Sequence, residues 1–179
     1  MPRLSGSVPD PGPSSEFSLR VADPGDRDAV ASVLEASYPV LMADAYPPTL
    51  LEKVRAAITR ANPRLLASGS YYIVESGDMA VGCGGWTHEE PGGGSARSGI
   101  AHLRHFAARA DWSGRGIGRL IYERCEEDAR RAGVRTLECW ASLNGEGFYA
   151  ALGFASLGPI DVVMDGGVVF PSIRMRRRL

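Results

Sequence analysis

The sequence predicts one domain of the α+β class, with a central, mixed but mostly antiparallel sheet and helices on both faces. Three apolar runs, at 71–75, 79–86 and 100–108, are joined by short polar links that contain glycine, which is typical of an antiparallel meander. After the meander, a glycine turn, an amphipathic helix and a further strand indicate one parallel crossover. A length of 179 residues is that of a single domain.

The chain begins with a segment that has little to bury. Residues 1–16 combine prolines with serine and glycine, so we expect a flexible leader there and a folded domain over residues 17–179. Alternating apolar and polar residues over 17–21 then predict the first strand.

Two helices are predicted between this strand and the meander. Asp23-Pro24 supplies an N-cap and a first-turn proline for a helix that extends to Ser37. The segment Thr49-Leu50-Leu51-Glu52 has the pattern of a capping box, which predicts a second helix to about Ala61. Asn62-Pro63 is expected to end that helix.

The later elements follow from a change in the apolar spacing. Residues 116–132 place apolar side chains at helical intervals with Arg and Glu on the other face, and Gly133 is the expected C-cap. The remaining predicted elements are a strand over 134–141, a short helix over 145–152, and strands over 154–157 and 168–175.

Composition excludes several classes of protein. The chain has 20 Lys and Arg against 21 Asp and Glu, a balance that argues against a nucleic-acid partner. No apolar run approaches the roughly 20 residues of a membrane span, and the N-terminus lacks the apolar core of a signal peptide. Three scattered cysteines, expected to be buried, form no disulfide or metal-binding pattern. We therefore expect a cytoplasmic protein without a metal or a membrane partner.

The strongest local signal is Ser113-Gly114-Arg115-Gly116-Ile117-Gly118-Arg119, between the third strand and the amphipathic helix. Its glycines allow backbone N–H groups to approach a ligand, and the helix adds unpaired N–H groups and a positive dipole end. The sequence lacks the Lys-Ser/Thr of a Walker A loop. Glu138 lies at a spacing compatible with a dinucleotide-binding fingerprint. The antiparallel meander that precedes the loop, however, is not the start of a dinucleotide-binding fold. On these residues alone, a tight structural turn and a phosphate cradle both stay open.

A longer pattern around this loop resembles a known family. The span HLRHFAARADWSGRGIGRLIYERCEEDARRAGV is similar to the Arg/Gln-x-x-Gly-x-Gly/Ala segment of the GNAT superfamily of acyl-CoA-dependent N-acetyltransferases. The later WASLNGEGFYAALGF is similar to the segment that follows it in that family. The resemblance covers about 50 residues, from His102 to Phe154. Ser113 departs from it at the Arg/Gln position, which predicts altered affinity for the ligand.

The resemblance implies a co-substrate and residues that hold it. The co-substrate is acetyl-CoA. Tyr149 would protonate the leaving thiolate, a role suited to a phenol with an ordinary pKa of about 10. Main-chain groups of three residues on the third strand would pair with the pantetheine arm: Phe106, Ala107 and Ala108. The amides that would hold the pyrophosphate are those of Gly114, Arg115, Gly116, Ile117, Gly118 and Arg119.

A second catalytic group is needed because the acceptor amine must lose a proton before it attacks. Glu138 shares a strand face with Trp140 and is the candidate base, with a carboxylate paired to arginine as the alternative interpretation. His102, His105, Glu89 and Glu90 are further candidates. On a regular strand the two histidines point to opposite faces, which argues against a two-histidine metal site.

We therefore expect an N-acetyltransferase that moves an acetyl group from acetyl-CoA to a primary amine of a small molecule by direct attack. The alternatives are a CoA-binding regulatory or sensor module of the same fold without turnover, and a different nucleotide binder. By the same resemblance, segments 38–48 and 89–98 would set the acceptor, and a homodimer is possible. The identity of the acceptor and the oligomeric state are not predicted.

Overall fold

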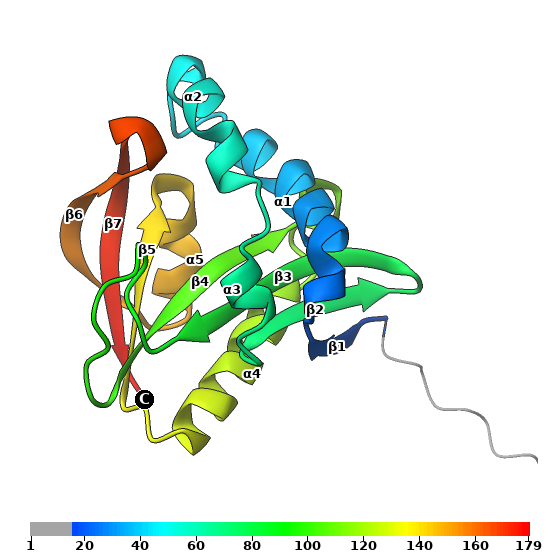
Figure 1. Ribbon diagram of the computed structural model, residues 1–179, viewed down its shortest axis with the longest axis vertical. Helices are drawn as coiled ribbons and strands as arrows, with labels where there is room; N and C mark the ends of the chain where they lie inside the picture. Colours follow the sequence, from blue (N-terminus) through cyan, green and yellow to red (C-terminus); the bar gives the residue numbers. More distant parts are fainter. Residues whose placement is uncertain (1–15) are drawn as a thin grey trace, which may run out of the picture.

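A seven-stranded sheet forms the centre of the computed structural model, which describes residues 16–179 (Figure 1). Its order is β1-β2-β3-β4-β5-β7-β6, and β4–β5 is the parallel pair among antiparallel neighbours. The predicted α+β class and mixed sheet are confirmed. The strands are β1 (Ser18–Val21), β2 (Tyr71–Ser76), β3 (Met79–Thr87), β4 (Ile100–Ala108), β5 (Thr136–Ser142), β6 (Ala155–Val163) and β7 (Val169–Arg178).

Helices cover both faces of the sheet. Residues of α1 and α3 pack with Tyr71, Ile73 and Cys83 on one face, whereas α4 and α5 pack on the other face (Figure 1). The α2 helix lies against the β6–β7 hairpin, where it forms a third apolar cluster. All three cysteines are buried, as predicted. The helices are α1 (Arg27–Leu41), α2 (Pro48–Ile58), α3 (Pro63–Leu66), α4 (Ile117–Arg131) and α5 (Glu146–Ala151).

The N-terminal helices differ from the prediction at their ends. Asp23 caps a 3-10 turn that leads into α1, and α1 continues to Leu41, one turn past the predicted end at Ser37. The predicted capping box at Thr49 is wrong because α2 already begins at Pro48, a residue favoured in the first turn. Asn62 does not simply end a helix; its side chain accepts from the amide of Arg64 and caps α3.

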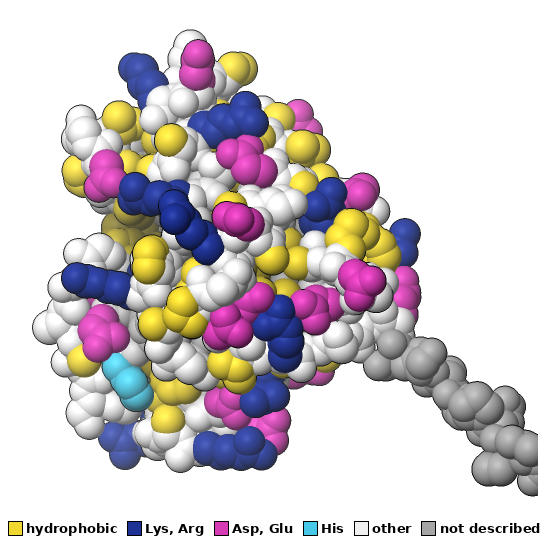
Figure 2. All heavy atoms as spheres, turned by 45° about the vertical axis from the view of Figure 1, so that its right-hand side comes forward, with side chains coloured by type: hydrophobic (Ala, Val, Ile, Leu, Met, Phe, Trp, Pro, Cys, Tyr) yellow, Lys and Arg dark blue, Asp and Glu magenta, His cyan; other side chains and the backbone are white. Residues whose placement is uncertain are grey.

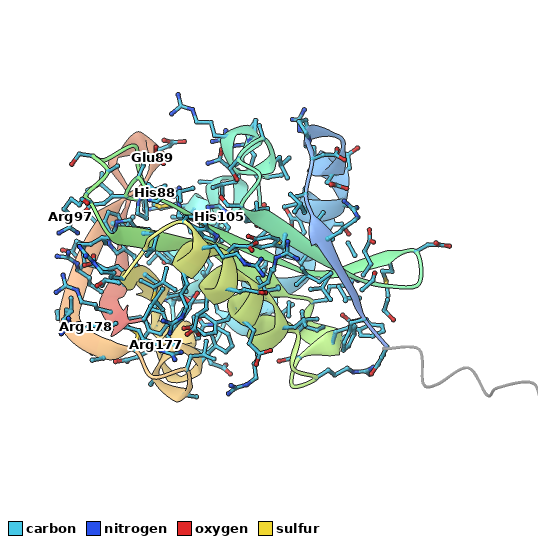
Figure 3. The ribbon with its side chains drawn as sticks, turned by 90° about the horizontal axis from the view of Figure 1, so that it is seen from below. His88, Glu89, Arg97, His105, Arg177 and Arg178 are labelled. Carbon is cyan, nitrogen blue, oxygen red and sulfur yellow. The ribbon has the colours of Figure 1, made fainter. Side chains whose placement is uncertain are left out.

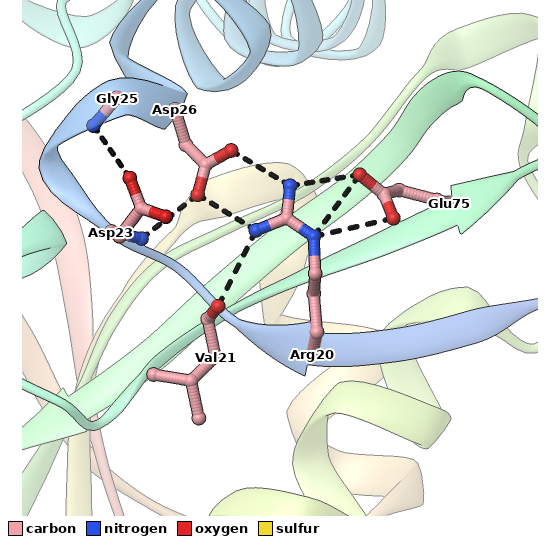
Figure 4. A network of polar contacts seen from close by, with 6 residues as sticks. All are labelled: Arg20, Val21, Asp23, Gly25, Asp26 and Glu75. Atoms are coloured by element: carbon pink, nitrogen blue, oxygen red, sulfur yellow. Dashed lines mark hydrogen bonds and ion pairs between the residues drawn. The ribbon is translucent and has the colours of Figure 1, made fainter.

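One arginine adds side-chain contacts to the backbone pairing of β1 with β2. Arg20 donates to both carboxylate oxygens of Asp26 at 2.7 and 2.8 Å and to Glu75 on β2 at 2.8 Å (Figure 4). This network joins β1, the 3-10 turn and β2. Residues 1–15 of the predicted leader lie outside the described residues.

The β4 strand contains a bulge that shapes the middle of the molecule. Cys83 on β3 faces Ala107, but Gly85 faces Arg104, so one residue of β3 spans two of β4. His105 sits at this point with a φ of 47°, an uncommon backbone conformation for a residue with a side chain. The regular alternation expected along β4 is therefore broken there.

The C-terminal hairpin is longer than predicted. β6 runs through Gly158 and Pro159 to Val163, well beyond the expected end at 157. Because β6 is an edge strand, the missing N–H of Pro159 is tolerated. Its partner β7 continues to Arg178, so the basic end of the chain is part of the sheet.

Candidate active site

A cavity of about 1050 Å³ lies where β4 and β5 diverge. The two strands pair only from Ile100 to His102 and from Thr136 to Glu138. Beyond that point, residues 103–108 and 139–142 line opposite walls of the cavity. Such a gap between parallel strands leaves backbone groups without sheet partners, and a ligand can use them.

The glycine loop forms one end of this cavity. Gly114 and Gly116 have φ values of 80° and 81°, which only glycine adopts readily, and α4 begins at Ile117. The first helical bond is from Leu120 N–H to the Gly116 carbonyl. Within residues 16–179, no hydrogen bond uses the amides from Gly114 to Arg119. They therefore form an anion cradle at the positive end of a 15-residue helix.

The two arginines of the loop differ in their surroundings. Arg115 stacks over Trp112, 4.5 Å from the ring centroid, and pairs with Glu16 at 3.1 Å. Arg119 is exposed and lines the cavity. Of the two loop arginines, therefore, Arg119 and not Arg115 lines the cavity.

The edge of β4 next to the loop has open backbone groups. Arg109 donates its N–H to Val81 on β3, so alternation directs the N–H and carbonyl of Ala108 away from β3. The carbonyl of Phe106 instead accepts a hydrogen bond from the Tyr38 hydroxyl at 3.0 Å. Of the three residues predicted to pair with the pantetheine, Ala108 has backbone N–H and carbonyl groups that point away from β3, whereas the carbonyl of Phe106 already accepts a hydrogen bond.

Tyr149 lies in the same cavity, on α5. Its ring packs between Phe106, Phe148 and Phe154, with centroids 5.0 to 6.2 Å away. Burial raises the pKa of Tyr149 well above its usual value, so the hydroxyl keeps its proton at neutral pH. Within the described chain the Tyr149 hydroxyl has no hydrogen-bond partner, whereas the Tyr38 hydroxyl is committed to a carbonyl. Tyr149 is thus the phenol with a proton available.

Glu138 has a different environment from the one predicted. It is 0% exposed and does not line the cavity. Its oxygens accept from Arg176 at 2.6 Å, Arg174 at 2.9 Å and Arg97 at 3.3 Å. Burial acts to raise the pKa of Glu138, but the hydrogen bonds from Arg174 and Arg176 outweigh it and hold that pKa below its usual range. The geometry is that of the arginine-paired carboxylate, and Glu138 has no part in the mechanism proposed below.

One cluster resembles a metal site in its residue types. Glu90, His102 and Glu138 have ligand atoms within 4.8 Å of one another, and both ring nitrogens of the buried His102 lack a partner in the described chain. Each oxygen of Glu138 already accepts from guanidinium groups, however, and three arginines bring positive charge to the same place. These charges oppose a cation. Burial lowers the pKa of His102, which keeps the ring neutral.

Among the candidate bases, His105 is the residue that lines the cavity. Figure 3 shows His105 further inside the molecule than His88, Glu89 and Arg97, which lie together at one end. Burial, with a smaller contribution from Arg104, lowers the pKa of His105 to about 4. A group with so low a pKa removes a proton from an ammonium poorly, and we assign it no role as a base.

The other end of the cavity is built from segments far apart in the sequence. Part of it comes from the two segments implied to set the acceptor, through Leu41, Met42 and Pro91. Sequence reasoning missed the rest because it has no motif, and only the fold brings it together. These additional residues include Ile58, Arg60, Arg104, Trp140, Asp161, Asp165, Phe170 and Ser172.

The surface itself carries no simple charge pattern. Figure 2 shows positive and negative side chains interspersed over the visible face, in keeping with the balanced composition. Among residues 16–179, no helix combines the length and apolar character needed to cross a membrane.

Comparisons with known proteins agree with this geometry. The family model described as Acetyltransferase (GNAT) domain matches residues 67–156, half of the chain, and the chain belongs to that family. The family and the fold show that the protein is an acyltransferase whose general activity is acetyl transfer. A comparison with curated proteins gives no match.

Solved structures show the same fold at low identity. A GCN5-related N-acetyltransferase from Rhodopseudomonas palustris is 24% identical with a TM-score of 0.76, covering 92% of this chain and 97% of the other. The PaiA N-acetyltransferase from Thermoplasma acidophilum, solved in complex with coenzyme A, is 13% identical with a TM-score of 0.65 over 91% and 99%. The ribosomal-protein-S18-alanine N-acetyltransferase from Escherichia coli is 17% identical with a TM-score of 0.59 over 90% and 93%.

Proposed function

We propose that this protein is an N-acetyltransferase that moves an acetyl group from acetyl-CoA to a primary amine of a small molecule. One observation carries the proposal: the free amides of the glycine loop, the open edge of Ala108 and the unpaired hydroxyl of Tyr149 line one cavity. The amides suit the pyrophosphate, and the strand edge suits the pantetheine amides. The thioester then lies in the gap between β4 and β5.

The proposed reaction is direct attack by the amine on the thioester carbonyl, without a covalent enzyme intermediate. Backbone N–H groups near the end of β4 polarise the carbonyl oxygen as negative charge develops on it. Collapse of the tetrahedral intermediate breaks the carbon–sulfur bond, and Tyr149 gives its proton to the departing thiolate. The proton that the attacking nitrogen loses passes to solvent water, and Tyr149 regains its own proton from water. The neutral state of Tyr149 supports this role, because only a protonated phenol can donate.

Binding and turnover are tested separately. Calorimetry with acetyl-CoA measures binding, and release of free thiol in the presence of a panel of amines measures transfer. Binding with thiol release supports the enzyme. Binding without thiol release for any amine supports a CoA-binding module, and displacement of acetyl-CoA by ATP supports a nucleotide binder.

The Tyr149→Phe variant tests the proposed acid. We expect kcat to fall about 100-fold, a usual contribution of a general acid, while the Kd for acetyl-CoA stays unchanged. Tyr72→Phe is the matched control, because its hydroxyl bonds Asp128 at 2.7 Å and does not line the cavity. A Tyr149→Phe enzyme with full turnover at every pH removes Tyr149 from the mechanism.

A further inference from the structure

Arg104 differs from the other arginines that the fold partly buries. In residues 16–179, the other partly buried arginines each have a carboxylate oxygen within 4.0 Å. Arg104 has none, and it lines the cavity. Partly buried charges are normally paired, so an unpaired guanidinium on a cavity wall points to a partner that binds there.

The guanidinium of Arg104 is held in one orientation. Its Nη1 donates to the Thr87 hydroxyl at 2.9 Å, and that hydroxyl donates to the Glu89 carbonyl at 2.8 Å. Within the described chain, Nε and Nη2 have no hydrogen-bond partner, and neither atom is completely buried. These two atoms form the edge of a guanidinium that binds a carboxylate through two parallel hydrogen bonds.

The surroundings of Arg104 supply no substitute for such a ligand. Burial lowers the pKa of Arg104, and the charge of Glu89 opposes this, but Glu89 forms no ion pair with it. Asp161 and Asp165, the carboxylates of the cavity wall, are exposed on the β6–β7 side, where Asp165 pairs with Arg60 at 3.5 Å. Arg104 therefore has no carboxylate of the described chain within ion-pair distance.

The rest of the acceptor end is mainly apolar, with Met42, Ile58, Trp140 and Phe170 among its walls. These side chains suit the hydrocarbon body of a ligand. A single free guanidinium edge matches one carboxylate, whereas a phosphate dianion would call for further cations.

We propose that the acceptor is a primary amine that also carries a carboxylate, which Arg104 binds while the amine faces the thioester. This inference rests on the proposed N-acetyltransferase function and specifies its substrate class. Arg104 is then a specificity-determining residue that touches the substrate at the end remote from the reacting nitrogen.

The test compares amines that differ only in charge. L-Phenylalanine and L-phenylalaninamide form one pair, L-leucine and L-leucinamide a second, and 5-aminopentanoate and pentylamine a third. The ammonium group of each amino acid amide is the more acidic of its pair, so the amide has the more available nucleophile. A higher kcat/KM for the amino acid therefore reports recognition of the carboxylate.

We expect Arg104→Gln to lower kcat/KM for the carboxylate member about 100-fold and to change it less than 3-fold for the neutral member. Arg104→Lys keeps the charge but lacks the two-donor edge, and an intermediate loss is expected. Arg64→Gln, at an exposed position on α3, is the matched control. An unchanged Kd for acetyl-CoA shows that each variant is folded.

A second readout does not depend on turnover. 3-Phenylpropionate has the carboxylate and the apolar body but no amine, and calorimetry on the CoA-saturated protein measures its binding. Binding to the wild type that is lost in Arg104→Gln supports the anion site even if no amine is acetylated, which would overturn only the proposed function. Equal rates for charged and neutral members, equal losses for both in Arg104→Gln, or no binding of 3-phenylpropionate would each overturn the inference.

Discussion

Replacing Glu138 with Gln is expected to destabilise the fold strongly. The carboxylate is 0% exposed and neutralises the guanidinium groups of Arg97, Arg174 and Arg176, which come from the β3–β4 loop and from β7. Glutamine keeps the shape of the side chain but removes the charge, and its NH₂ group faces donors instead of acceptors. Three positive charges then remain close together with one carboxylate, Glu90, beside them.

The magnitude follows from burial on each side of the pair. Removing one member of a buried ion pair costs about 3–5 kcal/mol. Here the arginine side chains are 35–40% exposed and can recover part of their hydration, which places the loss near the lower limit, about 3 kcal/mol. For a chain of this length, that corresponds to a fall in Tm of roughly 6–12 °C.

Urea unfolding at pH 7.5 measures the free energy of unfolding of the wild type and of Glu138→Gln. Glu127→Gln is the control, because Glu127 forms an exposed pair with Arg131 on α4, and a change of about 0.5 kcal/mol or less is expected. Below its melting range, Glu138→Gln should keep kcat within 3-fold of the wild type. A stability loss under about 1 kcal/mol together with a 100-fold loss of kcat would refute this reasoning and make Glu138 the catalytic base.

Two further predictions follow from backbone conformation and burial. Gly116→Ala places a side chain at a φ of 81° with open space around it, so strain of about 1–2 kcal/mol tilts the loop amides and lowers acetyl-CoA affinity about 10-fold by calorimetry. Gly147→Ala, inside α5 at an ordinary φ, should leave that affinity unchanged, and equal affinities for the two variants would contradict the cradle. Folding lowers the pKa of His105 from 6.5 to about 4, so as the pH falls the imidazole is protonated in the unfolded chain before it is protonated in the folded protein. The free energy of unfolding therefore falls by up to about 3 kcal/mol between pH 6.5 and pH 4. His105→Asn tolerates the positive φ and should flatten that part of the urea-unfolding profile; an unchanged slope would exclude His105 as its source.

The local elements were largely predictable because their signals are local. The three meander strands were placed within about a residue of their observed ends, and the glycine loop and α4 were found from spacing alone. The errors arose where neighbours along the chain do not decide the outcome. The apolar run predicted a strand over 154–157 only, but pairing with β7 carries β6 past Pro159, at a sheet edge where no N–H is needed.

The candidate site divides in the same way. Glu138 was correctly placed on a strand face with Trp140, but which groups meet that face depends on the register of β7 against β5, which sets Arg176 opposite Glu138 and Arg174 opposite Trp140. Alternation alone cannot show that register, because it arises from pairing between segments more than 30 residues apart.

The sequence by itself determined the α+β class, the family resemblance and the place of the glycine loop before α4, since periodicity, turn glycines and a helix start depend on residues close in the chain. The tertiary structure alone decided which side chains share the cavity. The divergence of β4 from β5 brings Tyr149, the glycine loop and Arg104 to the walls of one cavity. It also decided which charges are compensated, leaving Glu138 saturated by arginines and Arg104 without a carboxylate, because ion pairing depends on distances that only the folded chain defines.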